Sequence, residues 1–136
     1  MREILFRGKR KVCDEWVYGF PFISRKGEYK IKWYDVYYGS SKTSEIYTES
    51  IGQFTGLTDK NGKKIFEGDI CRFREWNKGE MCWVGKVYWE HQQFMIVGGP
   101  NKECETMFEL CMSRFIPENI EVIGNIHDSP ELLENP

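Results

Sequence analysis

The sequence predicts a single-domain protein built mainly of β-strands, and three features of its composition support this prediction. Its 136 residues are the length of one ordinary domain. The chain contains no alanine, the best helix former, but it contains 13 glycines. Aromatic residues make up 15% of the chain, and aromatic side chains fit the half-buried surface of a pleated sheet. This composition excludes a helical bundle, and a hydrophobic content of 40% argues against a disordered chain.

Two strands are expected near the start of the chain. Residues 3–7 are predicted to form a strand that ends at Gly8. Residues 16–20 are predicted to form the returning strand, because aromatic and β-branched residues dominate them. Pro21 lacks the backbone N–H that a central strand would use, so we expect it at the edge or the end of this second strand.

A third strand is expected over residues 29–38, where side chains alternate roughly between the two faces of a strand. The alternation places Tyr29, Ile31 and Trp33 on one face. The segment that follows, residues 39–44, is polar and begins with a glycine. We expect this segment to be a loop.

Glycine turns mark the middle of the chain. Asn61-Gly62 predicts a tight turn of type I′, in which both central residues have a positive φ. Glu67-Gly68 has the composition of a second turn, and a strand is expected over residues 69–75. Residues 77–79 supply the turn that should end this strand.

Residues 81–90 have the clearest strand pattern in the chain. Every second side chain is predicted to face the same way, so that Trp83 and Trp89 share one face. The apolar spacing over residues 105–115 fits either a strand or a helix. Further elements are expected as follows: strands over residues 93–97 and 120–126, and a short helical turn that begins at Ser129-Pro130.

Short strands separated by glycine turns between residues 65 and 126 predict a small, strongly bent barrel of the SH3-like kind. The expected organisation is one domain over residues 1–136, because no repeat or linker divides the chain. Within it we expect three regions: N-terminal strands packed on the barrel (1–49), the SH3-like barrel (50–126) and a C-terminal tail with the helical turn (127–136).

The charges restrict the classes of partner. The chain has 19 Lys and Arg against 21 Asp and Glu, a net charge of −2, which disfavours a strong nucleic-acid or membrane-surface binder. The distribution is uneven, with +4 in residues 1–68 and −6 in residues 69–136, which suits contacts between copies in a homo-oligomer. No apolar run approaches the roughly 20 residues needed to cross a bilayer, and the N-terminus lacks a secretory pattern. We therefore expect a cytoplasmic protein without a membrane partner.

Sites built on cysteine and histidine are disfavoured. Cys82, His91, Cys104 and Cys111 are the residue types that bind zinc, but they lack the paired spacing typical of zinc sites. A catalytic pair of a cysteine with His91 or His127 has no recognisable nucleophile motif. We expect no metal, no cofactor and mostly reduced, buried cysteines.

Asp59, Glu67 and Asp69 form a candidate acidic cluster. The spacing of Glu67 and Asp69 would place both carboxylates on one side of an extended strand, where they could bind a divalent cation or act as acid and base. The favoured interpretation is structural, because carboxylates beside a turn glycine commonly accept backbone N–H groups. An enzyme is therefore not expected.

Nucleic-acid binding is an alternative that rests on basic side chains near aromatic ones. Arg72 and Arg74 share a strand face, and such residues can contact phosphates while aromatic rings stack on bases. The candidate contacts are Arg72, Arg74, Trp76 and Lys78, together with the N-terminal Arg7, Lys9, Arg10 and Lys11. The sequence pI of about 5.8 counts against this alternative.

Three blocks of sequence resemble the YopX family of phage and prophage proteins. The blocks are FRGK with WVYG at 6–9 and 16–19, IGQFTGLTDKNGKKIFEGDI at 51–70, and IEVIGNIHDSPELL at 120–133. They occur in the family's order and span nearly the whole chain. The motif positions expected to have structural roles are Gly8, Trp16, Gly19, Gly52, Gln53, Phe54, Gly56, Gly62, Gly68 and Gly124.

The resemblance implies a mainly β protein with an SH3-like barrel, encoded by a tailed phage or a prophage. It implies no catalytic residues, because no activity is established for the family. The predicted function is that of a phage accessory protein that assembles with itself or binds a bacterial host protein, without enzymatic activity. A nucleic-acid-binding barrel is the first alternative, and a hydrolase that uses Glu67 and Asp69 is the second.

Overall fold

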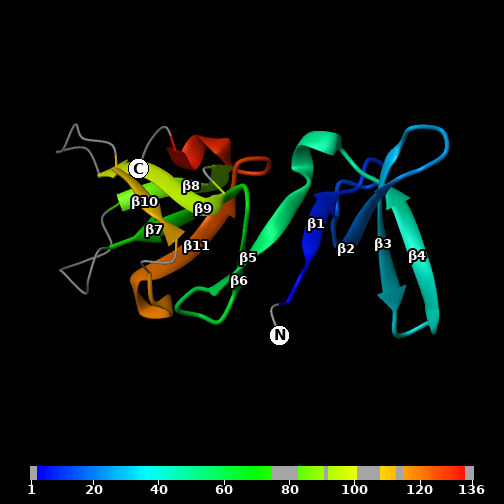
Figure 1. Cartoon of the computed structure of the whole chain (residues 1–136), viewed down its shortest axis with the longest axis horizontal. Helices are drawn as coiled ribbons and strands as arrows, with labels where there is room; N and C mark the ends of the chain where they lie inside the picture. Colours follow the sequence, from blue (N-terminus) through cyan, green and yellow to red (C-terminus); the bar gives the residue numbers. More distant parts are fainter. Residues whose placement is uncertain (1–2, 75–82, 91, 101–107, 113–114, 134–136) are drawn as a thin grey trace. The chain divides into compact units, whose positions relative to one another are not determined.

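The computed structural model describes all residues except 1–2, 75–82, 91, 101–107, 113–114 and 134–136 (Figure 1). The described residues form antiparallel β-sheets joined by turns and short 3₁₀ segments, which confirms the predicted mainly β class. In this part of the chain no helix is long and apolar enough to span a bilayer. The chain divides into two compact units, residues 1–54 and residues 55–136, each of which is described by itself.

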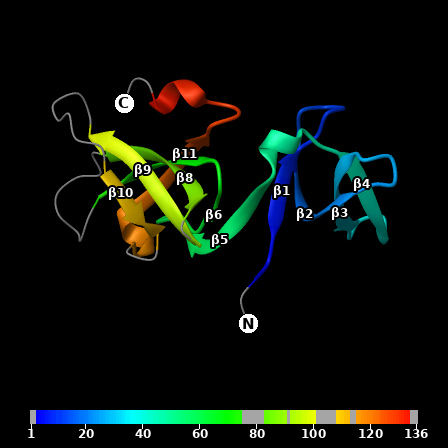
Figure 2. The same ribbon diagram turned by 45° about the horizontal axis from the view of Figure 1, so that its top comes forward.

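The N-terminal unit is an antiparallel sheet in which neighbouring strands follow the order β4-β3-β2-β1-β5. A β-bridge between Arg10 and Ile46 also connects the chain after β1 with the chain after β4. Figures 1 and 2 show β2, β3 and β4 side by side in this unit. The elements are β1 (Phe6–Lys9), β2 (Trp16–Ile23), β3 (Tyr29–Asp35), β4 (Ser40–Glu45), the 3₁₀ segment η1 (Thr48–Ser50) and the start of β5 (Gly52–Thr58).

The inner face of this sheet is closely packed around two buried isoleucines, Ile31 and Ile46. A Cβ atom on Gly8 would lie 2.8 Å from Ile31 Cδ1 and 2.7 Å from Ile46 Cδ1. A Cβ atom on Gly19 would lie 2.1 Å from the carbonyl oxygen of Lys32. Both glycines therefore lie where only a hydrogen atom fits, which explains why this unit needs glycine inside its strands.

Three boundaries predicted for this unit are wrong, and one of them is the end of the third strand, β3, which ends at Asp35 instead of residue 38 because residues 36–39 form a turn. The first strand begins at Phe6 and continues through Gly8 to Lys9, because Gly8 makes room for the core and does not form a turn. The second strand continues past Pro21 to Ile23. Its first half pairs with β1 and its second half with β3, so Pro21 lies where β2 has a neighbour on one side.

The predicted polar loop over residues 39–44 is also wrong. Residues 40–45 form strand β4, which pairs with β3 over its whole length. The pairing uses backbone groups, so polar side chains do not prevent it. Ser44 is buried on this strand, where its Oγ accepts a hydrogen bond from Arg10 Nε at 2.9 Å.

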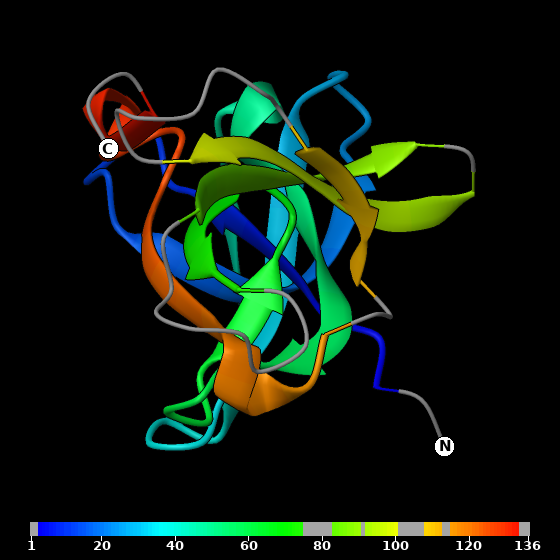
Figure 3. The same ribbon diagram turned by 90° about the vertical axis from the view of Figure 1, so that its left-hand side faces the viewer.

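The C-terminal unit contains a five-stranded antiparallel sheet with the order β10-β9-β8-β7-β11. In Figure 3 the strands of this unit face the viewer. Residues 108–111 are a strand, which settles the predicted ambiguity there, and the predicted C-terminal turn is confirmed. The elements are β6 (Lys64–Phe66), β7 (Asp69–Phe73), β8 (Trp83–Glu90), β9 (Gln93–Pro100), β10 (Phe108–Cys111), η3 (Pro117–Asn119), β11 (Ile120–Asn125) and η4 (Pro130–Leu133).

The core of this unit is centred on Phe73, whose ring centroid lies 5.6 Å from that of Trp83 and 5.5 Å from that of Phe115. The ring centroids of Trp89 and the buried Phe94 are 4.7 Å apart, and Trp83 packs against the core, so Trp83 and Trp89 share one face of β8, as predicted, although Trp89 is half-exposed. The buried members of the core are Ile65, Cys71, Phe73, Val87, Phe94, Ile96, Met112, Phe115 and Ile120. The more specific SH3-like assignment stays a prediction.

Candidate binding surface

Asp59 of the candidate acidic cluster is buried, and its carboxylate accepts hydrogen bonds from backbone N–H groups. Its Oδ1 accepts hydrogen bonds from the amides of Asn61 and Lys63, both at 2.9 Å. Its Oδ2 accepts the amide of Val122 at 2.9 Å. Asp59 therefore connects the β5–β6 turn to strand β11, which is the structural role that the sequence favoured.

The turn beside Asp59 is not the predicted type I′ turn. Gly62 has a φ of +77°, but Asn61 is not among the described non-glycine residues with positive φ. The Gly62 amide donates to the Asp59 carbonyl at 3.0 Å, and the Asp59 amide donates to the Lys63 carbonyl at 2.8 Å. This pattern is typical of a three-residue hairpin loop that ends in a glycine bulge.

Glu67 and Asp69 do not have the geometry of neighbours on an extended strand. Glu67 and Gly68 form a turn between β6 and β7, and Gly68 has a φ of +87°. Asp69 is buried, and its Oδ2 accepts the amide of Phe66 at 2.8 Å. Among the residues that the structure describes, no three His, Cys, Asp or Glu side chains are grouped so that they could hold a metal ion.

Two of the predicted nucleic-acid contacts, Arg72 on β7 and Arg74 just after it, lie near polar groups of the protein itself, and Arg74 is not on the strand that was predicted to carry both. Arg72 Nη1 lies 4.0 Å from Glu121 Oε2, the same oxygen that lies 3.4 Å from Lys60 Nζ. Arg74 Nε donates to Asn119 Oδ1 at 3.1 Å. The other two candidates, Trp76 and Lys78, lie outside the described residues. Nucleic-acid binding by this group therefore stays a prediction, and the charge of Arg72 is partly offset by Glu121.

Most of the cysteine and histidine candidates also lie outside the described residues, namely Cys82, His91 and Cys104. Cys111 Sγ donates to Gln93 Oε1 at 3.1 Å. His127 donates its backbone N–H to Asn125 Oδ1 at 3.0 Å.

Several of the family-motif residues lie where the backbone has a positive φ or where neighbouring atoms leave no room for a larger side chain. Gly56 has a φ of +90° within β5, and Gly62 and Gly68 also have a positive φ, of +77° and +87°, in their turns. A Cβ atom on Gly124 would lie 2.8 Å from Leu132 Cδ1. Phe54 is buried, Gly52 and Gln53 pair with β1, and Trp16 lies beside Arg7, whose guanidinium carbon is 4.7 Å from the ring centroid.

A group of aromatic side chains lies on the outer side of the N-terminal sheet, and we call it the aromatic face. It consists of Tyr18, Phe20 and Phe22 on β2 and Tyr34 on β3. Alternate residues of a strand share a side, so the three β2 residues face the same way. Their exposed fractions are 48% for Tyr18, 60% for Phe20, 39% for Phe22 and 62% for Tyr34.

Lysines separate the rings of the aromatic face. Phe20 is the cross-strand partner of Lys32, and Phe22 is the partner of Lys30. Partners in an antiparallel pair have their side chains on the same side of the sheet, about 5 Å apart at Cβ. Tyr34 is on this side as well, because it lies two residues after Lys32.

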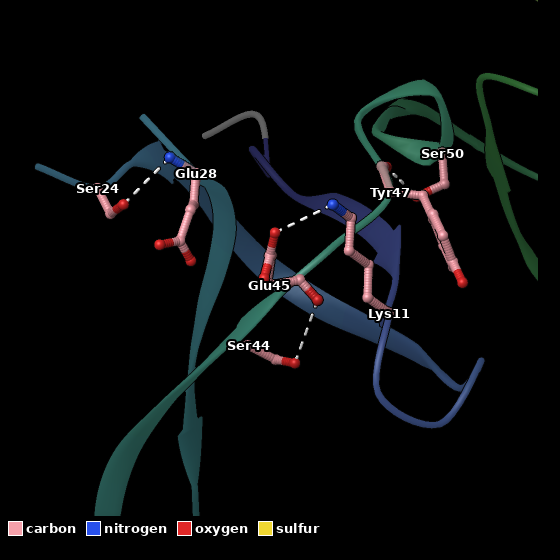
Figure 4. Close-up of polar contacts among 7 residues, drawn as sticks. All are labelled: Lys11, Ser24, Glu28, Ser44, Glu45, Tyr47 and Ser50. Carbon is pink, nitrogen blue, oxygen red and sulfur yellow. Dashed lines mark hydrogen bonds and ion pairs between the residues drawn. The ribbon is translucent and has the colours of Figure 1, made fainter. Parts of the chain in front are cut away.

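The outer side of β1–β4 carries a single acidic residue, Glu45, which pairs with Lys30 across β3 and β4. Glu45 Oε1 also accepts a hydrogen bond from Lys11 Nζ at 3.0 Å (Figure 4). That hydrogen bond raises the pKa of Lys11 above its usual 10.5, with a smaller coulombic contribution from the same carboxylate. Glu45 therefore forms an exposed ion pair with Lys11, and this side of the strands still carries more basic than acidic residues.

The hairpin end beside Phe22 is fixed by its own hydrogen bonds. In the β2–β3 turn, Ser24 Oγ accepts the amide of Glu28 at 3.2 Å (Figure 4). Gly27, with a φ of +82°, donates its amide to the Ser24 carbonyl at 2.9 Å. This turn repeats the construction seen at Asp59, and it exposes Arg25 and Lys26.

The hairpin end beyond Tyr34 is organised by Asp35. Its Oδ1 accepts the amides of Tyr37 and Tyr38 at 3.0 and 3.2 Å. Its Oδ2 lies 2.9 Å from Lys42 Nζ, and that ammonium lies 4.3 Å from the centroid of the Tyr38 ring. The hydrogen bond to Lys42 is the main reason why the pKa of Asp35 is lowered, with the backbone amides adding to it.

The sequence contained the signal for the aromatic face but the predicted strand boundary hid it. Tyr18, Phe20 and Phe22 alternate in the printed sequence. The strand was expected to stop near Pro21, so Phe22 was not placed on it. The structure continues β2 to Ile23 and brings Phe22 onto the same side as Phe20.

Comparison with known proteins gives the family and the fold. The profile of the YopX protein family matches residues 5–134, so the chain belongs to the YopX family. No curated protein matches the sequence. A similar solved structure is the crystal structure of protein EF1440 from Enterococcus faecalis, with a TM-score of 0.55 and 24% sequence identity over 98% of this chain and 99% of that chain. That similarity concerns the fold alone.

Proposed function

We propose that the protein is a non-enzymatic binding module that engages a macromolecular partner through the aromatic face. The observation that carries the proposal is the exposure of Tyr18, Phe20, Phe22 and Tyr34 on one side of one sheet. Aromatic side chains are costly to leave in water, and grouped ones commonly mark a binding surface. The buried core of the same sheet is on its other side, around Ile31, so these rings lie outside that core.

The use of the carboxylates supports a role without catalysis. A general acid or base needs a carboxylate that can reach a substrate. Asp59 and Asp69 are buried, and each accepts backbone amides. We place the protein in the cytoplasm of a bacterium, as the accessory protein of a phage or prophage, where its partner is a host component or a second copy of the chain.

Photo-crosslinking of the full-length protein tests the proposed surface. Benzoylphenylalanine would replace Phe20, and in a matched control it would replace Val12, which is exposed in the turn before β2. The proteins would be produced in the bacterial host during phage growth and irradiated. We expect adducts from position 20 and few from position 12. Equal yields at the two positions, or none at either, would contradict the proposal.

Self-assembly is the second candidate, and the charges of the two units support it. Residues 1–54 have a net charge of +3, and residues 55–136 have a net charge of −5. Opposite charges suit a head-to-tail contact between copies. In sedimentation velocity at low salt this contact would give oligomers that dissociate at high salt, whereas a monomer at every concentration would exclude it.

A further inference from the structure

We infer that the aromatic face binds a single-stranded nucleic acid, an inference that rests on the proposed binding function. The surface differs from the basic residues 72–78 that the sequence suggested, because it is built from β2 and β3 of the N-terminal unit. Rings for base stacking and ammonium groups for phosphates alternate on it, which is the combination found on single-strand binding surfaces.

The spacing of the rings favours a single strand over a duplex. Phe20 and Phe22 are two residues apart on β2, which corresponds to about 6.6 Å along an extended strand. Bases in a duplex are stacked about 3.4 Å apart along each strand and expose their edges, not their faces. Bases that stack on neighbouring rings here must therefore be separated from one another, as they are in a splayed single strand.

The lysines are placed to accompany each ring. Lys32 lies beside Phe20 and Lys30 beside Phe22, in direct cross-strand pairs. A base on either ring would therefore have an ammonium group next to it for its phosphate. Arg25 and Lys26, exposed in the β2–β3 turn, continue the basic side chains past Phe22.

The same lysines neither cover the rings themselves nor suit a protein partner. The stem of a lysine can shield a neighbouring ring from water, but Phe20 beside Lys32 is still 60% exposed. The centre of a protein–protein interface is depleted in lysine, whereas here lysines stand between the rings. The acidic pI is no obstacle, because the excess of acidic residues lies in residues 55–136.

Fluorescence anisotropy with the full-length protein tests the inference. The probes are labelled dT12 and U12 strands and a 12-base-pair duplex, each at 50 and 200 mM salt. We expect the single strands to bind, the duplex to bind at least tenfold more weakly, and added salt to weaken binding. Phe20→Ser and Phe22→Ser should each reduce the affinity for a single strand about tenfold or more.

Three further variants separate stacking from charge and from folding. Phe20→Leu keeps an apolar side chain but removes the ring, so it should lose most of the affinity that Phe20→Ser loses. The double variant Lys30→Gln/Lys32→Gln should lower the slope of log affinity against log salt by about 1.4, which is the value for two phosphates on a single strand. Tyr37→Ser, which removes an 88% exposed ring off the face, should leave the affinity unchanged.

The outcomes distinguish this inference from the proposed function. It is overturned if no single strand binds at 50 mM salt, if the duplex binds equally well, or if Tyr37→Ser weakens binding as much as Phe20→Ser. If nucleic acid does not bind while position 20 crosslinks to a protein, the binding function stands and the nucleic-acid inference fails. If there is neither binding nor crosslinking, both fail.

Discussion

The carboxylate of Asp59 accepts the backbone N–H of Val122, 63 residues later in the chain, at 2.9 Å. With the amides of Asn61 and Lys63, this gives the buried carboxylate of Asp59 three hydrogen bonds to backbone donors. One side chain thus holds a hairpin turn and a distant strand together. This member of the candidate acidic cluster is therefore a structural link within the C-terminal unit.

Replacing Asp59 tests this link. Asp59→Ala would leave three backbone N–H groups without their acceptor, so we expect the free energy of unfolding to fall by about 3 kcal/mol or more. Asp59→Asn keeps one acceptor oxygen and should lose less. Ser24→Ala is the control, because Ser24 begins a turn of the same construction but its side chain accepts a single amide in a less buried place. Its free energy of unfolding should fall by less than about 1 kcal/mol. Urea denaturation measures all three, and equal losses for Asp59→Ala and Ser24→Ala would refute the assignment.

Glycines in the N-terminal sheet should differ sharply in their tolerance of a methyl group. In Gly19→Ala the new Cβ meets the backbone oxygen of Lys32, which cannot move without separating β2 from β3, so we expect a loss of about 3 kcal/mol or more. In Gly8→Ala it meets the ends of two isoleucine side chains, which can shift, at about 1–3 kcal/mol.

Gly27→Ala is the matched control for these two variants. Its Cβ would have nothing within 4 Å, and the cost comes from a φ of +82°, about 1–2 kcal/mol. Thermal unfolding ranks the three proteins. A Gly19→Ala protein as stable as Gly27→Ala would show that β2 and β3 do not approach as closely as described.

The pKa of Asp35 gives a prediction about acid. Its pKa in the folded protein lies below the usual 3.8, so the stabilisation that the carboxylate provides is present above pH 3.8 and is lost as the pH falls through the lowered value. NMR titration should show the amides of Tyr37 and Tyr38 changing in that acidic range. Lys42→Met should return the pKa of Asp35 toward 3.8, and an unchanged titration in this variant would argue against the contact with Lys42.

Local chemistry in the sequence was sufficient for much of this structure. The β class, the turn at Gly62 and the hydrogen bonds of Asp59 to amides of its own turn follow from glycine, proline and side-chain patterns within a few residues. The type of that turn did not follow, because the buried carboxylate of Asp59 binds the amides of the loop and Asn61 does not adopt a positive φ.

The features that were missed depend on pairing between distant segments. Strand β4 is polar and exists because its backbone pairs with β3. Gly8 had the composition of a strand end, yet it lies inside a strand because Ile31 and Ile46 pack against it. The aromatic face needed the register of β2 against β3, which puts Lys32 beside Phe20. None of these contacts is visible in a window of neighbouring residues.

The most direct test of the binding surface is an NMR titration of the full-length, ¹⁵N-labelled protein with unlabelled dT12. If the aromatic face binds the strand, amide signals of residues 16–23 and 29–35 should shift as the oligonucleotide is added, and those of β7 and β11 should stay in place. Shifts confined to β7 and β11 would favour the Arg72 surface instead. No shift at any oligonucleotide concentration would contradict the account.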